Sequence, residues 1–218
     1  MCGRVGVKKG IEGLVLEHLG AAGATEDWAV PNPNVAPTNA IPAVRLVDGA
    51  RVAASYLWGF LPPNAPNRAF ISQYFTFNAR DDKVATGRLY EKSFKNQRCL
   101  IVVSAWFEWP KIGGAKKGTP CTITPTTGDF LVFAGLWGPW MDPETGIHYD
   151  TTTVVTTEPN ELVADLPHHR MPAVLPDTDW ATWLDPATPV PDLQALLRPC
   201  PSDWLDVRAG GPQGFSVD

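Results

Sequence analysis

The segment Cys99–Trp109, which reads CLIVVSAWFEW, constrains the fold of this chain more than any other. Its first half is a continuous run of apolar, largely β-branched residues, and such a run favours a strand that is buried on both faces. In its second half, successive side chains of a strand would face opposite sides, so that Trp106 and Glu108 share one face. We therefore predict one continuous strand over Cys99–Trp109.

Further strands and a few helices are predicted around this segment. Apolar runs at Ile41–Val47 and Arg51–Leu57 flank Asp48-Gly49, which is the pattern of a β-hairpin. Periodicity predicts further strands at 120–125, 129–135 and 151–156, and helices at 11–19, 159–166, 177–184 (with Asp177 as N-cap) and 191–198. Turn residues predict turns at 112–118, 127–128 and 143–146, and proline-rich loops at 25–39 and 62–68. Strands precede most of the helices without regular βαβ alternation. We therefore predict a single α+β domain with a mostly antiparallel, β-barrel-like core sheet and a few peripheral helices.

Composition and charge narrow the class of protein. A chain of 218 residues is long enough for one domain with a substantial core, and the net charge of −5 argues mildly against a nucleic-acid partner unless arginines cluster locally. The first residues contain no apolar signal-peptide segment, and no apolar run approaches the roughly 20 residues that span a bilayer. We expect a cytoplasmic monomer that does not associate with membranes.

The four cysteines are Cys2, Cys99, Cys121 and Cys200, and their long, irregular gaps include no C-x-x-C pair. This spacing argues against a structural zinc site and against a disulfide framework. Cys99 and Cys121 lie in apolar, strand-like runs and are predicted core residues. The sequence also lacks a glycine-rich phosphate loop, an H-E-x-x-H zinc motif and a G-x-S-x-G elbow. We expect no metal and no cofactor.

Cys2 is the candidate nucleophile. A small residue after the initiator Met generally permits its removal, which would give Cys2 a free α-amine beside its thiol. The amine has an ordinary pKa of about 8 and the thiol of about 8.5, so both are partly nucleophilic at neutral pH. Such a 1,2-aminothiol reacts with an aldehyde to give a Schiff base and then a thiazolidine ring, and ring closure is intramolecular. From its position alone, a disordered terminal cysteine without a role is the simpler interpretation.

Three further sites carry polar groups that can assist chemistry. Glu108 is bracketed by apolar residues, and burial there would raise the pKa of its carboxyl toward the range useful for proton transfer. His168 and His169 point in different directions, which makes a poor chelating pair but leaves room for one catalytic imidazole. Asn78-Ala79-Arg80 can place an amide beside a guanidinium. Each of these also has a purely structural interpretation.

Taken together, these segments resemble the SOS response-associated peptidase (SRAP) family of abasic-site processing proteins. The matching motifs run in the family's order, over residues 1 to about 185: Met1-Cys2-Gly3-Arg4, Asn34-Val35-Ala36-Pro37-Thr38, Trp58-Gly59-Phe60, Asn78-Ala79-Arg80, Arg98-Cys99, Trp106-Phe107-Glu108-Trp109, Ala134-Gly135-Leu136 and His168-His169-Arg170-Met171-Pro172. The sequence departs from the usual family pattern at Asn64, Asp82, Lys83, Val103 and His169, and in its short segment after Trp204.

The resemblance implies a barrel-like α+β domain with a positively charged groove for single-stranded DNA containing abasic sites. It implies that Cys2 forms a covalent thiazolidine crosslink with the ring-opened sugar, as part of the DNA damage response. Asn78 would position the Cys2 amine, Glu108 would transfer protons, and His168 would assist opening of the sugar.

The resemblance also implies a set of DNA contacts. The expected DNA-binding residues are Arg4, Asn34, Pro37, Trp58, Arg80, Trp106 and Arg170. Because the net charge is negative, we also expect a local cationic patch that includes Arg45 and Arg98.

Two rival functions use the same residues. Cys2, His168 and Glu108 are also the groups of a cysteine peptidase or amidase with an N-terminal nucleophile, which would remove a short leader from itself. Alternatively, the chain is a non-covalent module for single-stranded DNA, in which Cys2 has no chemical role.

Overall fold

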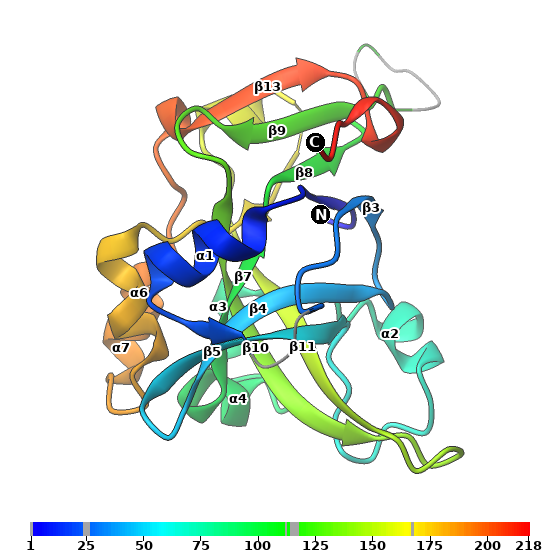
Figure 1. The fold of residues 1–218 in the computed structure, drawn as a ribbon, viewed down its shortest axis with the longest axis vertical. Helices are drawn as coiled ribbons and strands as arrows, with labels where there is room; N and C mark the ends of the chain where they lie inside the picture. The colour runs from blue at the N-terminus through cyan, green and yellow to red at the C-terminus, as the bar shows by residue number, and fades with distance from the viewer. Residues whose placement is uncertain (1, 24–26, 112, 114–117, 167) are drawn as a thin grey trace.

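The computed structural model describes residues 2–23, 27–111, 113, 118–166 and 168–218. It consists of a closed β-barrel, a smaller antiparallel sheet that lies over one end of the barrel, and helices packed around the barrel (Figure 1). The predicted α+β class and barrel-like core are confirmed.

Five strands form the barrel. They are β4 (Ala40–Val47), β5 (Ala50–Trp58), β7 (Arg98–Val103), β10 (Leu131–Met141) and β11 (His148–Thr157). Antiparallel pairs run in the order β5-β4-β7-β10-β11, and β11 also pairs in parallel with β5, with Thr151 opposite Leu57. This last pairing closes the ring, so that the sheet has no free edge along these strands.

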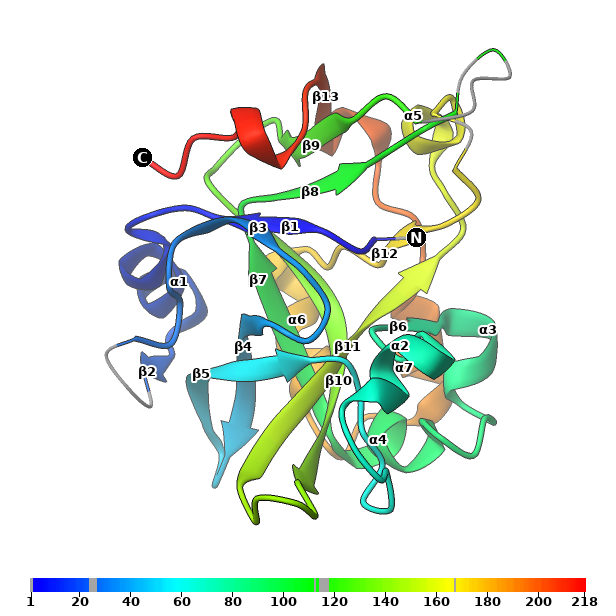
Figure 2. The ribbon, with the colours of Figure 1, turned by 90° about the vertical axis from the view of Figure 1, so that its right-hand side faces the viewer.

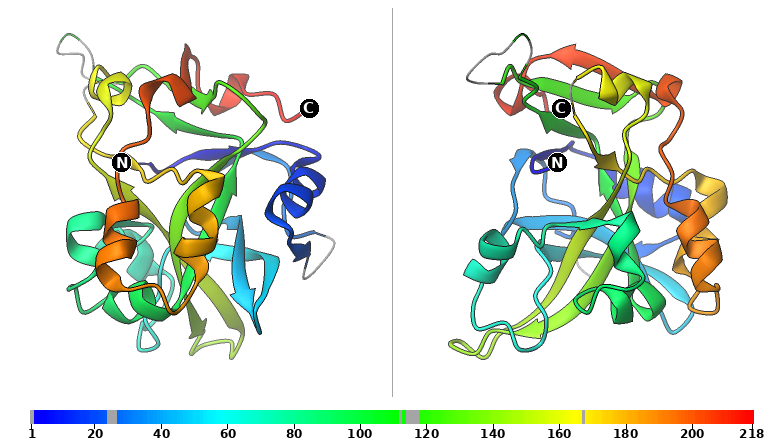
Figure 3. Two further views of the ribbon diagram at one scale, coloured as in Figure 1. Left: turned by 90° about the vertical axis from the view of Figure 1, so that its left-hand side faces the viewer. Right: turned by 180° about the vertical axis from the view of Figure 1, so that it is seen from behind.

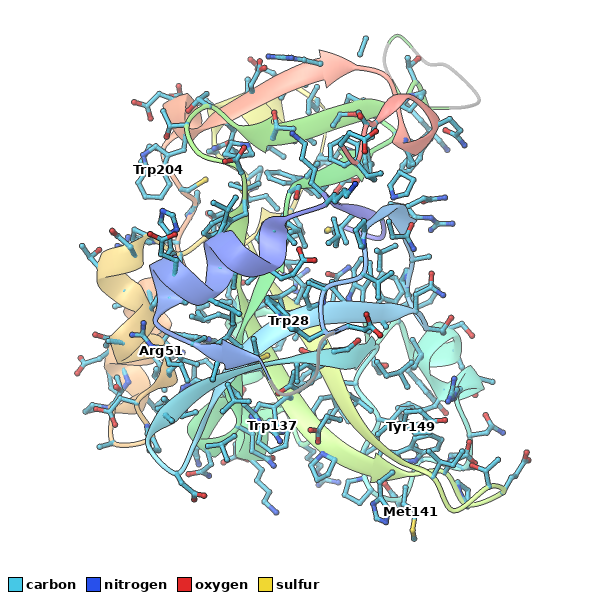
Figure 4. The ribbon with its side chains drawn as sticks, viewed as in Figure 1. Trp28, Arg51, Trp137, Met141, Tyr149 and Trp204 are labelled. Carbon is cyan, nitrogen blue, oxygen red and sulfur yellow. The ribbon has the colours of Figure 1, made fainter. Side chains whose placement is uncertain are left out.

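The barrel is packed with side chains and is not a channel. A Cβ on Gly135 of β10 would lie 2.7 Å from Cys99 Sγ and 2.8 Å from Ile101, so the strands approach too closely there for any larger residue. Trp137 lies at the barrel end away from the smaller sheet (Figure 4). The Arg45 guanidinium lies 3.8 Å from the ring centroid of Trp137 and pairs with Asp150 at 2.9 Å. Arg45 is therefore not part of a cationic patch near the N-terminus, contrary to the prediction.

The smaller sheet has the strand order β13-β9-β8-β1-β3. Its strands are β1 (Val5–Val7), β3 (Asn32–Val35), β8 (Ala105–Glu108), β9 (Cys121–Pro125) and β13 (Leu205–Ala209). β1 lies between β3 and β8, directly below β8 in Figure 2, and the short strand β12 (Met171–Pro172) pairs with the end of β11. The sheet therefore holds the strand that leads directly out of the N-terminal segment.

The predicted single strand Cys99–Trp109 is wrong, because the chain divides it between the two layers. β7 ends at Val103 in the barrel, and β8 begins at Ala105 in the smaller sheet. Ser104 forms the junction, where its backbone N–H donates to Gly6 O and its Oγ accepts from Lys8 N. Both halves are buried, as predicted, but they are buried against different partners, and no glycine or proline marks the junction.

The predicted helix at 11–19 is confirmed as α1 (Ile11–Leu19), which ends at Gly20 in the left-handed conformation. The predicted hairpin is confirmed, with Asp48 and Gly49 both at positive φ in its turn. The helix predicted at 177–184 is confirmed as α6, but its N-cap is Pro176, because Asp177 already has helical geometry. The turn predicted at 112–118 lies largely outside the described residues.

The remaining helices are α2 (Ala69–Tyr74), α3 (Asp81–Val84), α4 (Glu91–Asn96), α5 (Glu161–Ala164), α6 (Asp177–Leu184) and α7 (Val190–Leu196). Two short strands, β2 (Ala22–Gly23) and β6 (Asn78–Arg80), extend the barrel sheet. α6 packs against β7 and α7 packs against α6, outside the barrel (Figure 3). No helix in the described part of the chain is long and apolar enough to cross a membrane.

Arg98 joins two of these helices to the barrel and does not face DNA, which corrects its predicted place in the cationic patch. Its buried guanidinium donates to the carbonyls of Trp183 and Asp185 at the end of α6, and to those of Phe94 and Lys95 in α4, at 2.6–2.7 Å. Burial lowers its pKa to about 10, so it keeps its charge at neutral pH. A cation at two helix C-termini is also favoured by both helix dipoles.

We predict that Arg98→Met lowers the free energy of unfolding by about 3 kcal/mol, because it leaves several carbonyls without a donor. Urea denaturation measures this change. Arg208→Met is the control, since the Arg208 side chain is 79% exposed and should change stability by less than about 0.5 kcal/mol. Equal effects of the two substitutions would contradict the role assigned to Arg98.

Candidate active site

Strand pairing brings Cys2 to Glu108. β1 and β8 are antiparallel, with Val5 opposite Trp106 and Gly6 opposite Ala105. The Phe107 backbone N–H donates to Arg4 O at 3.0 Å, which extends the ladder toward the N-terminus. Continuing the register places Gly3 opposite Glu108, so Cys2 lies beside the end of β8.

The end of β11 brings Asn78 and His168 close to Cys2 and Glu108. β6 pairs in parallel with β11 through Val154 and Asn78, and β12 pairs with the same strand through Thr157 and Met171. Asn78 begins β6, and His168 lies three residues before β12. Asn78, Glu108 and His168 therefore come from three segments that are distant in sequence, and they meet near the N-terminus.

Two contacts define the site. Asn78 Nδ2 donates to the backbone carbonyl of Cys2 at 2.7 Å, and His168 Nε2 lies 3.4 Å from Glu108 Oε2. Cys2 is fully buried, and Glu108 is 4% exposed. The structure thus brings together the four predicted catalytic residues. Asn78 holds Cys2 through the Cys2 carbonyl. The buried Oδ1 of Asn78 has no hydrogen-bond partner among the residues that the structure describes.

The contact between Glu108 and His168 is not an ion pair at neutral pH. Burial raises the pKa of Glu108 to about 7 and lowers the pKa of His168 to about 4. An ion pair would move both pKa values in the opposite directions. The contact therefore joins a neutral imidazole to a carboxyl that is partly protonated near pH 7, a state suited to both donating and accepting protons.

The Cys2 thiol stays protonated in this environment. Burial raises its pKa well above the ordinary value, and the nearby Glu108 carboxylate raises it further. A hydrogen bond from the Arg4 backbone N–H acts in the opposite direction but is a smaller effect. The resting sulfur is therefore a thiol that needs a base when it reacts.

Two arginines predicted to bind DNA are already held by aspartates. Arg80 makes two hydrogen bonds to Asp82 at 2.9 Å and remains exposed, whereas Arg170 is largely buried and donates to Asp81 at 2.5 Å and to Thr156 O. Arg170 therefore ties the segment of His168 to the start of α3. In the sequence, Asp82 stands out only as a departure from the family pattern, and Asp81 does not stand out. The two consecutive aspartates directly after Arg80 were the sequence signal for arginine–aspartate pairing here.

The two predicted tryptophans do not face solvent. Trp58 and Trp106 are fully buried, and Trp58 Nε1 donates to Phe77 O. Neither ring can stack on a base, which corrects their prediction as DNA contacts; they support the walls of the site. Asn34 is exposed and Pro37 and Arg4 are half-buried, so these three remain accessible.

Exposed aromatic rings occur instead at the end of α2, where sequence reasoning did not look for them. Tyr74 is 56% exposed and Phe75 is 59% exposed. Phe75 caps α2 at a φ of 54°, a left-handed conformation that is rare for a large residue. Its ring contacts Phe77, which in turn contacts Trp58, with ring centroids 6.2 and 6.3 Å apart. The left-handed cap holds Phe75 outward, three residues before Asn78.

Metal ligands do not cluster at this site. Among the residues that the structure describes, no group of three or more histidines, cysteines, aspartates or glutamates is placed to hold an ion. The polar groups near Cys2 are instead suited to transferring protons.

We predict that Glu108→Gln makes the stability less dependent on pH. Because the folded pKa of about 7 lies above the ordinary value of 4.5, folding favours the protonated carboxyl, and the wild type loses stability as the pH rises from about 4.5 to about 7. The variant should therefore be more stable than wild type at pH 8, by up to about 3 kcal/mol, and similar at pH 4.5. Urea denaturation at both pH values measures this. Glu158→Gln, at an exposed position, should show no such dependence; a pH-independent difference for Glu108→Gln would contradict the raised pKa.

Comparison with known proteins identifies the family of this chain. The sequence model of the family described as SOS response associated peptidase (SRAP) matches residues 1–209. The abasic site processing protein YoqW of Bacillus subtilis is 32% identical over 208 residues, which cover 94% of this chain and 90% of the YoqW chain. YobE of the same organism, also described as an abasic site processing protein, is 34% identical over 178 residues, covering 81% of this chain and 78% of its own.

Solved structures share the fold. A protein from Bacteroides thetaiotaomicron superposes with a TM-score of 0.82 at 22% identity, covering 99% of this chain and 98% of its own. A protein from Bordetella bronchiseptica superposes with a TM-score of 0.78 at 25% identity, covering 96% and 99%. The match of the family model along nearly the whole chain, together with these relatives, shows that this chain belongs to the SRAP family.

Proposed function

We propose that this protein processes abasic sites in DNA by capturing them covalently through Cys2. The observation that carries the proposal is the buried meeting of Cys2 with Asn78 and Glu108, in which the Glu108 pKa is about 7. The relatives named abasic site processing proteins support the same substrate. Removal of Met1 is part of the proposal, because it creates the α-amine of Cys2.

The chemistry runs in two steps. The Cys2 amine adds to the aldehyde carbon of the ring-opened sugar, and the resulting carbinolamine loses water to give an imine. The thiol then adds to the imine carbon, and its proton moves to the nitrogen to complete a thiazolidine. The net change is the loss of one water, with no oxidant, reductant or cofactor.

The surroundings of Cys2 suit these steps. A partly protonated Glu108 can donate a proton to the departing hydroxyl and later accept the proton of the thiol. The raised pKa of the Cys2 thiol favours first attack by the amine, since the thiol needs a base. Asn78 fixes Cys2 through the Cys2 carbonyl, and the Asn78 Oδ1, which no described residue occupies, would accept a hydrogen bond from the new amine. His168 is neutral and available to assist opening of the sugar.

The DNA strand would be held by a few exposed groups. In this proposal the accessible Arg4 and Arg80 bind phosphates, with Arg80 released from Asp82, and the exposed rings of Tyr74 and Phe75 stack on bases. We propose single-stranded DNA as the substrate because ring stacking requires bases that are not paired with a second strand.

The electrostatics favour crosslinking over peptidase chemistry. A cysteine peptidase lowers its thiol pKa with an adjacent imidazolium. Here burial raises the pKa of Cys2 and lowers that of His168, and the His168 contact is with Glu108. These charges do not activate a thiolate.

The proposal predicts a denaturation-resistant band when wild-type protein is mixed with single-stranded DNA that contains one abasic site. Cys2→Ala should abolish the band, and Glu108→Gln should slow its formation by roughly 10²-fold or more. Cys200→Ala is the control, because Cys200 is also buried but packs beside Asn160, and it should leave the rate unchanged.

The two rival functions predict different experimental results. Equal non-covalent binding of intact and abasic DNA, without a covalent band, would favour the single-strand binding module. Cleavage of a peptide by the wild type but not by Cys2→Ala would favour the peptidase. Mass spectrometry must first confirm that Met1 is absent from the protein used.

A second prediction concerns Asp82, which occupies the guanidinium of Arg80 and so competes with phosphate. Asp82→Asn should strengthen binding to single-stranded DNA about threefold at low salt, and the advantage should shrink as salt rises. Asp206→Asn is the control, because Asp206 also pairs with an exposed arginine two residues away, Arg208, and the net charge changes equally. Equal effects of both variants in fluorescence anisotropy would contradict a specific role for Arg80.

A further inference from the structure

The last residues of the chain cross the sheet that carries the active site. After β13, the Gly210 backbone N–H donates to Pro120 O, and Gly210 O accepts from Thr122 Oγ1. At the other end of the segment, Lys9 N donates to Val217 O at 2.7 Å, just beyond β1. Residues 210–218 therefore run from β9 across β8 to β1, along the upper side of the molecule in Figure 2. We call these residues the C-terminal strap.

Phe215 anchors this strap between two strands. Its ring stands edge-to-face to Phe107 of β8, with centroids 5.5 Å apart and planes at 82°. Its Cε1 lies 2.5 Å from the position that a Cβ on Gly6 of β1 would take. Gly6 therefore leaves a hole in β1 that the Phe215 ring fills, and any side chain at position 6 would displace the ring.

The contact lies on the sheet face opposite the main core. Val5, Val7 and Trp106 belong to the core cluster, whereas their neighbours Gly6 and Phe107 point to the other face. Phe107 is nonetheless fully buried, and Phe215 covers it. The strap thus completes the burial of the outer face of β1 and β8.

These two strands set the positions of the reacting groups. Glu108 follows Phe107 directly, and Cys2 precedes Gly6 by four residues. The hydrogen bond from Phe107 N to Arg4 O lies between the Phe215 contacts and the site. A small shift of β1 against β8 would therefore change the position of Cys2 relative to Glu108.

We propose that Phe215 is a positioning residue, which clamps β1 onto β8 and thereby holds Cys2 buried against Glu108. The strap lies outside the residues 1–209 that match the family model, so this role rests on the packing of this chain. Its effect on crosslinking rests on the function proposed above, but its effect on the burial of Cys2 does not.

The first measurement is the alkylation rate of Cys2, followed by peptide mass spectrometry in native buffer. Phe215→Ala should raise the rate roughly tenfold, because local opening of β1 exposes the thiol. Phe215→Leu should restore most of the protection. Phe130→Ala is the matched control, since Phe130 is a half-buried aromatic that contacts His18 on a different side of the barrel. Equal alkylation of Cys2 in Phe215→Ala and wild type would overturn the proposal.

The second measurement is the pH profile of crosslinking to abasic DNA. Phe215→Ala should slow crosslinking about tenfold, and the apparent pKa near 7 contributed by Glu108 should move toward its ordinary value as water reaches the carboxyl. A merely structural role would lower the melting temperature as Phe130→Ala does and leave this profile unchanged, which would overturn the proposal. If the wild type forms no crosslink but alkylation responds as expected, the proposed function fails and the clamp stands.

Discussion

The antiparallel pairing of β1 with β8 is the constraint on which the rest of the site depends. It places Gly3 opposite Glu108, and so brings the N-terminal segment to a buried carboxyl whose pKa is raised to about 7. Because alternate side chains on a strand face opposite sides, a slip of one residue would point Glu108 away from Cys2. The β3 strand on one side of β1 and the β8 strand on the other leave little freedom for such a slip. The barrel contributes the end of β11, which fixes the segments of Asn78 and His168.

Burial, more than pairing of opposite charges, governs the chemistry available at this site. It raises the pKa values of Cys2 and Glu108 and lowers that of His168, so all three groups tend toward their neutral forms. A thiolate nucleophile is disfavoured in such surroundings, whereas condensation of an amine with an aldehyde needs only a proton donor and acceptor close at hand. The cations that could attract DNA are restrained in a similar way, since Asp82 and Asp81 hold Arg80 and Arg170. These pairings limit the positive charge that faces a DNA strand.

Local signals in the sequence predicted the elements that depend on local interactions. α1 follows from its helical spacing and the glycine that ends it, and the β4–β5 hairpin follows from Asp48-Gly49. The division of Cys99–Trp109 into β7 and β8 could not be predicted, because no turn residue separates the halves and the junction at Ser104 is fixed by contacts with Gly6 and Lys8. The short strands β6 and β12 exist only through pairing with β11. The four catalytic candidates came from motif order and do meet in space, whereas the burial of Trp58, Trp106 and Arg98 depends on tertiary packing that the sequence does not reveal.

The most direct test of the central claim is the mass of the N-terminal peptide after capture. Crosslinked protein is digested with nuclease and trypsin, and the peptide from Cys2 to Arg4 is measured by tandem mass spectrometry. The account predicts that this peptide carries the sugar-phosphate remnant with the loss of one water, and that its thiol resists alkylation, because amine and sulfur are both bound to one carbon. A remnant on a lysine, or a Cys2 peptide that alkylates normally after capture, would contradict the claim that Cys2 forms the covalent link.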